Sequence, residues 1–149
     1  MRKMITGGLA VTLAVATAAA TGAFAGGNGA QRSGLSPQSG SSTNQCQPGS
    51  GSGTNGFVIL NAPGQPGNAT KLIGEVSLKR GTPNTTYMVQ VASNDGNNNC
   101  MPEGTLTTNG VGNGNAHIAD PTLGGGSFYV VLTDSNTNEA FASGPLSVN

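Results

Sequence analysis

The chain of 149 residues contains one histidine, His117, and histidine is the side chain most often used in acid–base catalysis. It lies in residues 115–119, an alternating segment in which successive side chains of a strand would point to opposite sides. His117 is therefore expected to point away from Ala116 and Ile118, toward solvent. No G-x-S-x-G motif supplies a serine nucleophile. We interpret His117 as an exposed strand residue rather than as a member of a Ser-His-Asp site.

The acidic residues are the other side chains that could catalyse hydrolysis, because glycosidases use a pair of carboxylates. The chain has six of them: Glu75, Asp95, Glu103, Asp120, Asp134 and Glu139. Four lie in or beside predicted turns, and the chain has no tryptophan to stack against a sugar ring. We therefore predict no catalytic residue and a protein that is not an enzyme. A secreted hydrolase is the least favoured alternative.

Asp95, Asn97 and Asn99 have the spacing of the first three ligands of an EF-hand calcium loop. The sixth position of such a loop is Cys100 instead of glycine, and the twelfth is Leu106 instead of glutamate. Asp and Asn are also common in turns, because their side chains bond to the nearby backbone. We predict a turn here, with no metal and no cofactor bound to the protein.

The charge balance and the aromatic content argue against a nucleic-acid-binding protein. Six basic residues oppose six acidic ones, and aromatic residues make up 4% of the chain. Nucleic-acid-binding proteins need a basic surface and aromatic side chains on which bases stack. Low charge together with 25 glycines also favours short strands and turns over a helical bundle.

The first 25 residues have the three parts of a secretory signal peptide. Arg2 and Lys3 form the basic start, residues 5–21 form an uncharged apolar run, and residues 23–25 read Ala-Phe-Ala. Signal peptidase needs small residues at this point, so we predict cleavage before Gly26. The signal resembles those of bacterial secreted proteins. We expect a secreted protein with no transmembrane span in the mature chain, whose partner is an unknown protein or envelope component.

The two cysteines, Cys46 and Cys100, are expected to form a disulfide, because an even number of cysteines in a secreted chain indicates bridges. Neither has a histidine or a second cysteine nearby in the sequence, which argues against a metal site and against a reactive thiol. A bridge that closes so long a loop stabilises a fold by ~4 kcal/mol in the chain-entropy treatment.

Strands must position these side chains, and two regions of different composition follow the signal peptide. Residues 26–55 are rich in Gly and Ser, with Leu35 as the only large aliphatic residue, so we predict a flexible, disordered N-terminal tail. In residues 56–149, short alternating or apolar runs are separated by turn signals. The run 127–133 is almost continuously apolar and is predicted to be a central strand. We expect one all-β domain, an antiparallel β-sandwich, with a small barrel as the alternative.

One segment of this domain resembles a known family. Residues 78–91 read Leu-Lys-Arg-Gly-Thr-Pro-Asn-Thr-Thr-Tyr-Met-Val-Gln-Val. This is similar to the L-x-P-x-T-x-Y-x-V-x-V segment of fibronectin type III and related bacterial immunoglobulin-like domains, with an insertion before Pro83 and without the tryptophan of such domains. The resemblance implies an immunoglobulin-like β-sandwich of about seven strands. It also implies that Tyr87 bonds back to the corner before its strand.

A second likeness is to the secreted seven-stranded apoproteins of the neocarzinostatin type. It rests on the Tyr87 strand and on the Asn- and Gly-rich residues 109–114 that precede residues 116–118. It implies a small-ligand carrier with a cleft between the sheets, although those proteins usually carry a second disulfide. Our leading expectation is a secreted, non-catalytic protein with a binding or structural role at or outside the bacterial cell surface. The ligand carrier is its main alternative.

Overall fold

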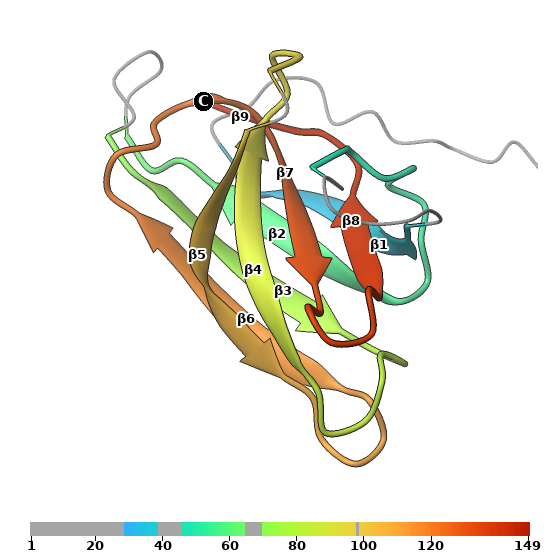
Figure 1. Ribbon diagram of the computed structural model, residues 1–149. Helices are drawn as coiled ribbons and strands as arrows, with labels where there is room; N and C mark the ends of the chain where they lie inside the picture. Colours follow the sequence, from blue (N-terminus) through green and yellow to red (C-terminus); the bar gives the residue numbers. More distant parts are fainter. Residues whose placement is uncertain (1–28, 39–45, 65–69, 98) are drawn as a thin grey trace, which may run out of the picture.

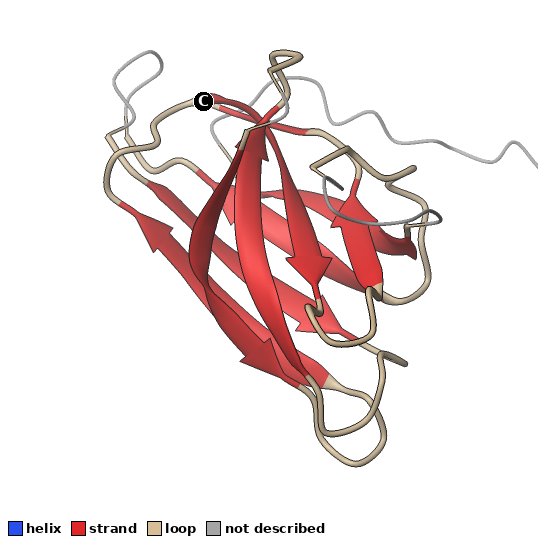
Figure 2. Ribbon diagram, viewed as in Figure 1, coloured by secondary structure: helices blue, strands red, loops and turns tan. Residues whose placement is uncertain are grey.

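The computed structural model describes residues 29–38, 46–64, 70–97 and 99–149, which form nine strands and no helix (Figures 1 and 2). The strands are β1 (Gln31–Pro37), β2 (Gly56–Asn61), β3 (Leu72–Leu78), β4 (Thr86–Ser93), β5 (Cys100–Thr107), β6 (Gly114–Asp120), β7 (Gly126–Thr133), β8 (Ala140–Ser143) and β9 (Leu146–Val148). The predicted signal peptide, residues 1–25, lies outside the described residues. In the part of the chain that is described, no helix has the length and apolar composition that a membrane crossing requires.

Antiparallel pairing joins the strands into a nearly closed, barrel-like sheet. The strand order is β5-β4-β7-β8-β1-β2-β3-β6, and β9 pairs with β7. β1 changes partner along its length, because residues 31–34 pair with β2 and residues 35–37 pair with β8. It therefore links a first sheet, made of β1, β2, β3 and β6, to a second sheet, made of β1, β8, β7, β9, β4 and β5. β5 and β6 are the two ends of the strand order.

This arrangement confirms the coarse prediction and corrects the finer one. The fold is all-β and antiparallel, as predicted. The nine strands and the continuity of the sheet through β1 do not clearly match an immunoglobulin-like sandwich of seven strands, and they are closer to the barrel alternative. One of the additional strands is β1, because the sequence prediction had no strand before residue 56.

β1 lies inside residues 26–55, and the prediction of a flexible tail is wrong for residues 31–37 and 46–55. The Leu35 side chain is fully buried, and the backbone N–H of Asn55 donates to its carbonyl oxygen at 3.1 Å. A Cβ atom added to Gly53 would lie 1.8 Å from that same oxygen, and one added to Gly34 would lie 2.5 Å from the carbonyl oxygen of Gly53. These glycines therefore permit close backbone contact, which composition alone cannot distinguish from flexibility.

The main hydrophobic core fills the space between the two sheets. Every strand contributes to it, and β7 contributes Phe128, Val130 and Leu132. The intervening side chains of β7, Tyr129 and Val131, are buried in a second, smaller cluster on the outer side of the second sheet. β7 pairs with β4, β8 and β9, so the prediction of a central strand at residues 127–133 is confirmed.

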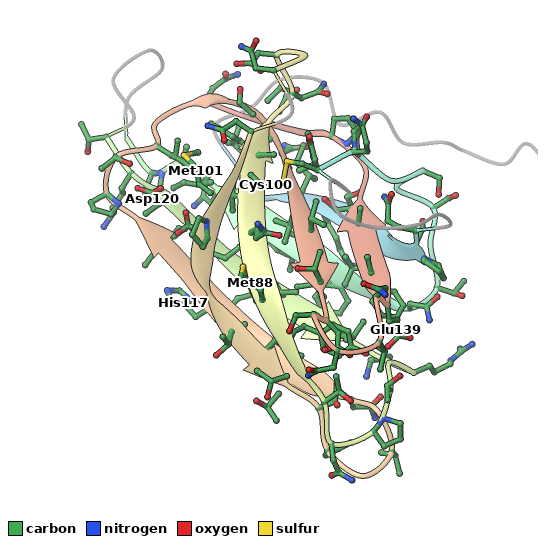
Figure 3. The ribbon with its side chains drawn as sticks, in the orientation of Figure 1. Met88, Cys100, Met101, His117, Asp120 and Glu139 are labelled. Atoms are coloured by element: carbon green, nitrogen blue, oxygen red, sulfur yellow. A yellow bond between two sulfur atoms is a disulfide. The ribbon has the colours of Figure 1, made fainter. Side chains whose placement is uncertain are left out.

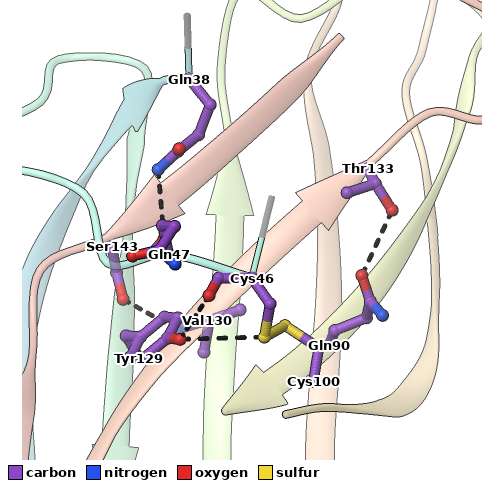
Figure 4. Close-up of a disulfide and its surroundings, with 9 residues drawn as sticks. All are labelled: Gln38, Cys46, Gln47, Gln90, Cys100, Tyr129, Val130, Thr133 and Ser143. Carbon is purple, nitrogen blue, oxygen red and sulfur yellow. Dashed lines mark hydrogen bonds between the residues drawn. A yellow bond between two sulfur atoms is a disulfide. The ribbon is translucent and has the colours of Figure 1, made fainter. Parts of the chain in front are cut away.

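The predicted disulfide between Cys46 and Cys100 is present, with 5.6 Å between the two Cα atoms (Figure 4). It fastens the segment after residue 45 to the start of β5, and both cysteines pack against the second cluster. The hydroxyl of Tyr129 donates to the carbonyl oxygen of Cys46 at 2.8 Å, and the N–H of Gly49 donates to the carbonyl oxygen of Ser143 at 2.7 Å. The N-terminal segment thus covers the part of the outer face of the second sheet that is formed by β7 and β8.

Candidate functional site

The outer face of the first sheet, which we call the open face, carries the alternate side chains of each strand that point away from the core. Along β3, for example, Val76 is buried and Glu75 is exposed. The same alternation governs β1, β2 and β6. The open face consists of Arg32, Phe57, Ile59, Asn61, Ile73, Glu75, Ser77, Asn115, His117 and Ala119.

Strand register aligns four of these side chains in one row across the open face. Arg32 on β1 is opposite Ile59 on β2, Ile59 is opposite Glu75 on β3, and Glu75 is opposite His117 on β6. Neighbouring strands lie about 4.8 Å apart, so members of the row are close enough to act together on one ligand surface. The row has an aliphatic centre, a cation at one end and a hydrogen-bonded carboxylate–imidazole pair at the other.

Two contacts within the open face fix its charged side chains. His117 Nδ1 lies 2.7 Å from Glu75 Oε1, and both side chains are well exposed, at 59% and 62%. An exposed pair of this kind contributes ~0–1 kcal/mol. The guanidinium of Arg32 lies 4.4 Å from the centre of the Phe57 ring, within the range of a cation–π contact. The prediction that His117 is an exposed strand residue is confirmed.

The outer face of the second sheet is covered by the chain itself in its central part, whereas Met88 on the same face is exposed. In that central part, Ala92, Tyr129, Val131 and Ala142 are buried beneath the disulfide and the segment that it holds. By contrast, the hydrophobic clusters formed by the described residues do not include the apolar side chains of the open face, Phe57, Ile59 and Ile73. The two outer faces of this small domain are therefore unequal.

Two acidic residues that the sequence analysis did not connect, Glu103 and Asp120, form a hydrogen-bonded pair between β5 and β6. Burial, together with the charge and the hydrogen bond of Asp120, raises the pKa of Glu103 from 4.5 to about 7. The pKa of Asp120 is lowered, chiefly because the hydroxyl and the backbone N–H of Thr122 both donate to its Oδ1 at 2.6 Å. The local sequence feature that could have indicated this pair is Pro102-Glu103-Gly104, in which a proline and a glycine flank the acid at a β-bulge.

The remaining candidates for chemistry are separate from this pair. Asp120 is buried, whereas His117 lies on the opposite, exposed side of the same strand, so the histidine does not join the two acids. The carboxylate of Asp95 accepts a hydrogen bond from the N–H of Asn97 at 2.9 Å, which is the turn expected in place of a calcium loop. That bond lowers the Asp95 pKa. Within the described ranges, no group of three His, Cys, Asp or Glu side chains could hold a metal ion.

Tyr87 makes the corner contact that the fibronectin type III resemblance implied. Its hydroxyl accepts a hydrogen bond from the N–H of Thr82 at 2.9 Å and donates to Oε2 of Glu139. Burial and the Glu139 carboxylate raise the pKa of Tyr87 to about 12. The Tyr87 ring packs edge-on against Phe141, with 5.9 Å between ring centres. Glu139 comes from the turn before β8, and nothing in the local sequence of Tyr87 indicated this partner.

Searches against protein-family models, curated proteins and solved structures found no match to this chain. Any functional assignment for the protein therefore rests on its own residues and their geometry.

Proposed function

We propose that the protein is a secreted, non-catalytic binding protein that acts at or outside the bacterial cell surface, and that it contacts its partner through the open face. The observation that carries this proposal is the inequality of the two outer faces. The chain covers the centre of one face with its own N-terminal segment and holds that cover with a disulfide. It leaves Phe57, Ile59 and Ile73 on the other face half-buried and outside both clusters. Grouped apolar side chains on a surface favour an interaction site.

The chemistry of the open face supports a protein partner. Protein interfaces have an apolar centre with aromatic and aliphatic anchors, surrounded by a polar rim. Phe57, Ile59 and Ile73 would form the centre, with Arg32 on one side and the Glu75–His117 pair on the other. The rim carries both signs of charge, whereas a nucleic acid would require a mainly basic surface.

The interior of the domain favours surface binding over the small-ligand carrier. Among the described residues, eighteen buried hydrophobic side chains form the core between the sheets, so apolar side chains occupy the region in which a carrier would hold its ligand. The Glu103–Asp120 pair lacks a nucleophile or histidine partner among the described contacts, and we do not propose a hydrolase.

The test of this function is capture of a partner by immobilised protein from the envelope and the culture supernatant of the producing bacterium. Ile59→Lys places a charge in the centre of the open face and is expected to reduce recovery of the partner by about tenfold or more. Met88→Lys is the matched control, because Met88 is an apolar strand residue on the outer face of the second sheet and is 46% exposed. Equal recovery with the wild type and with Ile59→Lys would contradict the proposal. Equal loss with both variants would also contradict it.

A further inference from the structure

β5 and β6 form a seam in which two consecutive strands lie near each other without a ladder of backbone hydrogen bonds. They stand at opposite ends of the strand order, although the short turn at residues 108–113 connects β5 directly to β6 in the sequence. At the turn end they touch, since a Cβ atom on Gly114 would lie 2.5 Å from Leu106 Cδ2. Asp120 and Met101 mark the other end of the seam (Figure 3). Side chains must therefore hold this part of the barrel-like sheet together.

Two features of β5 interrupt regular strand pairing. Pro102 has no N–H to donate to a ladder, and for this reason proline is found in sheets mainly on edge strands. In the pairing with β4, Val89 is opposite Gly104 and Gln90 is opposite Pro102, so Glu103 is the extra residue of a β-bulge. Gly104 has a φ of 147°, a backbone conformation that favours glycine. Bulges redirect a side chain and interrupt pairing, and here the redirected side chain is Glu103.

The bulge brings the carboxyl group of Glu103 to Asp120, the last residue of β6. Asp120 is 9% exposed and already accepts two hydrogen bonds from Thr122, which keep it ionised. Glu103 can bond to that carboxylate only as a donor, in its protonated form. When Glu103 loses its proton, two carboxylates face each other and repel.

The other charged and titratable groups around the seam do not neutralise this pair. On β4, the hydroxyl of Tyr87 is engaged with Thr82 and Glu139. On β6, His117 is engaged with Glu75 of β3, on the open face. Lys71, which precedes the β3 residue opposite Asp120, is exposed.

We propose that the Glu103–Asp120 pair is a proton-dependent latch, which closes the β5–β6 seam when Glu103 is protonated and releases it when Glu103 is ionised. Burial and the neighbouring charge place the pKa of Glu103 at about 7, so the latch changes state near neutral pH. β5 is the terminal strand of the second sheet, and after release it is held by its ladder with β4, by the disulfide at Cys100 and by the burial of Leu106 in the core. The latch makes the order of this edge depend on the pH outside the cell.

NMR of the full protein tests the latch in two ways. The side-chain carboxyl of Glu103 is expected to titrate with a midpoint of about 7, and a midpoint at its ordinary value of 4.5 would overturn the proposal. Hydrogen exchange, corrected for intrinsic rates, is expected to show protection of the β5 amides falling about tenfold between pH 5.5 and 8.5. The amides of β7 should not change with pH.

Two variants separate the latch from a general effect of pH. Glu103→Gln keeps a hydrogen-bond donor and has no proton to lose, so β5 protection should stay high and independent of pH. Glu75→Gln removes an acid from the neighbouring open face and should leave the pH dependence of β5 as in the wild type. A pH dependence that persists in Glu103→Gln, or disappears in Glu75→Gln, would overturn the proposal.

Discussion

Tyr87 holds together two segments that are far apart in the sequence. Its hydroxyl, the backbone N–H of Thr82 and the carboxylate of Glu139 form a closed set of three hydrogen bonds (Glu139 is labelled in Figure 3). The ring is fully buried against Phe141, so the hydroxyl has no access to bulk water. Leaving a buried polar group without a partner costs more free energy than the hydrogen bond itself contributes. Small changes at Tyr87 are therefore expected to lower stability.

Tyr87→Phe is expected to lower the free energy of unfolding by about 1–3 kcal/mol, because Thr82 and Glu139 lose a shared partner. Urea denaturation of the two proteins measures this difference. Tyr129→Phe is the comparison variant, since among the described residues the Tyr129 hydroxyl bonds only to Cys46, through its carbonyl oxygen at 2.8 Å and its Sγ at 3.8 Å, and its removal should cost less. An effect of Tyr87→Phe below that of Tyr129→Phe would contradict the interpretation.

For single residues, the sequence predicted contacts between residues that are close together in the chain. The Tyr87 corner involves Thr82, five residues away, and the family resemblance implied a bond back to this corner without naming its partner. Glu139 is 52 residues away from Tyr87, and only the folded chain brings it there. The Glu103–Asp120 pair was missed for the same reason, because it depends on a bulge and on the approach of two strand ends.

β1 is the element for which composition was most misleading. Its Gly- and Ser-rich surroundings have the features of a flexible tail, yet it pairs with β2 and β8 and joins the two sheets. The buried side chains of β1 are those of Leu35 and Ser33, and Leu35 is the only large apolar one. The Ser33 hydroxyl accepts a hydrogen bond from the N–H of Gly144 at 3.0 Å. A strand can thus be anchored by one large apolar residue when both neighbours supply a ladder.

Leu35→Ala is expected to lower the free energy of unfolding by about 2–5 kcal/mol, because it leaves a cavity where a fully buried side chain was. The control is Val111→Ala, since Val111 is 71% exposed and its truncation should change stability by less than about 0.5 kcal/mol. Thermal or urea unfolding measures both. If Leu35→Ala behaved like Val111→Ala, β1 would not be part of the folded domain.

For the molecule as a whole, titration of a few carboxyl groups sets the pH of greatest stability. Hydrogen bonds lower the pKa values of Asp95, Asp120 and Asp134, so the stability that they contribute is present above their ordinary value of 3.8 and is lost as the pH falls below it. Glu103 has the opposite sign. Its pKa is raised, so its contribution is complete below 4.5 and is lost as the pH rises to about 7.

The free energy of unfolding is therefore expected to be greatest between about pH 4 and 5, and to fall by about 1–2 kcal/mol between pH 5 and 8. Urea denaturation across this range measures the profile. Glu103→Gln should remove the decline above pH 5 and keep the loss of stability in acid. A profile that is flat from pH 5 to 8 in the wild type would contradict the assignment of Glu103.

The sequence by itself determined the all-β class, the disulfide partners, the central strand β7 and the exposure of His117. Each follows from local periodicity or, for Cys46 and Cys100, from there being one possible pair. Tertiary structure alone decided that β1 belongs to the sheet, that Arg32, Ile59, Glu75 and His117 share one row, and that Glu103 meets Asp120. The physical reason is that strand register and close backbone contact join residues distant in sequence, and the energy of those contacts is not encoded in any single segment.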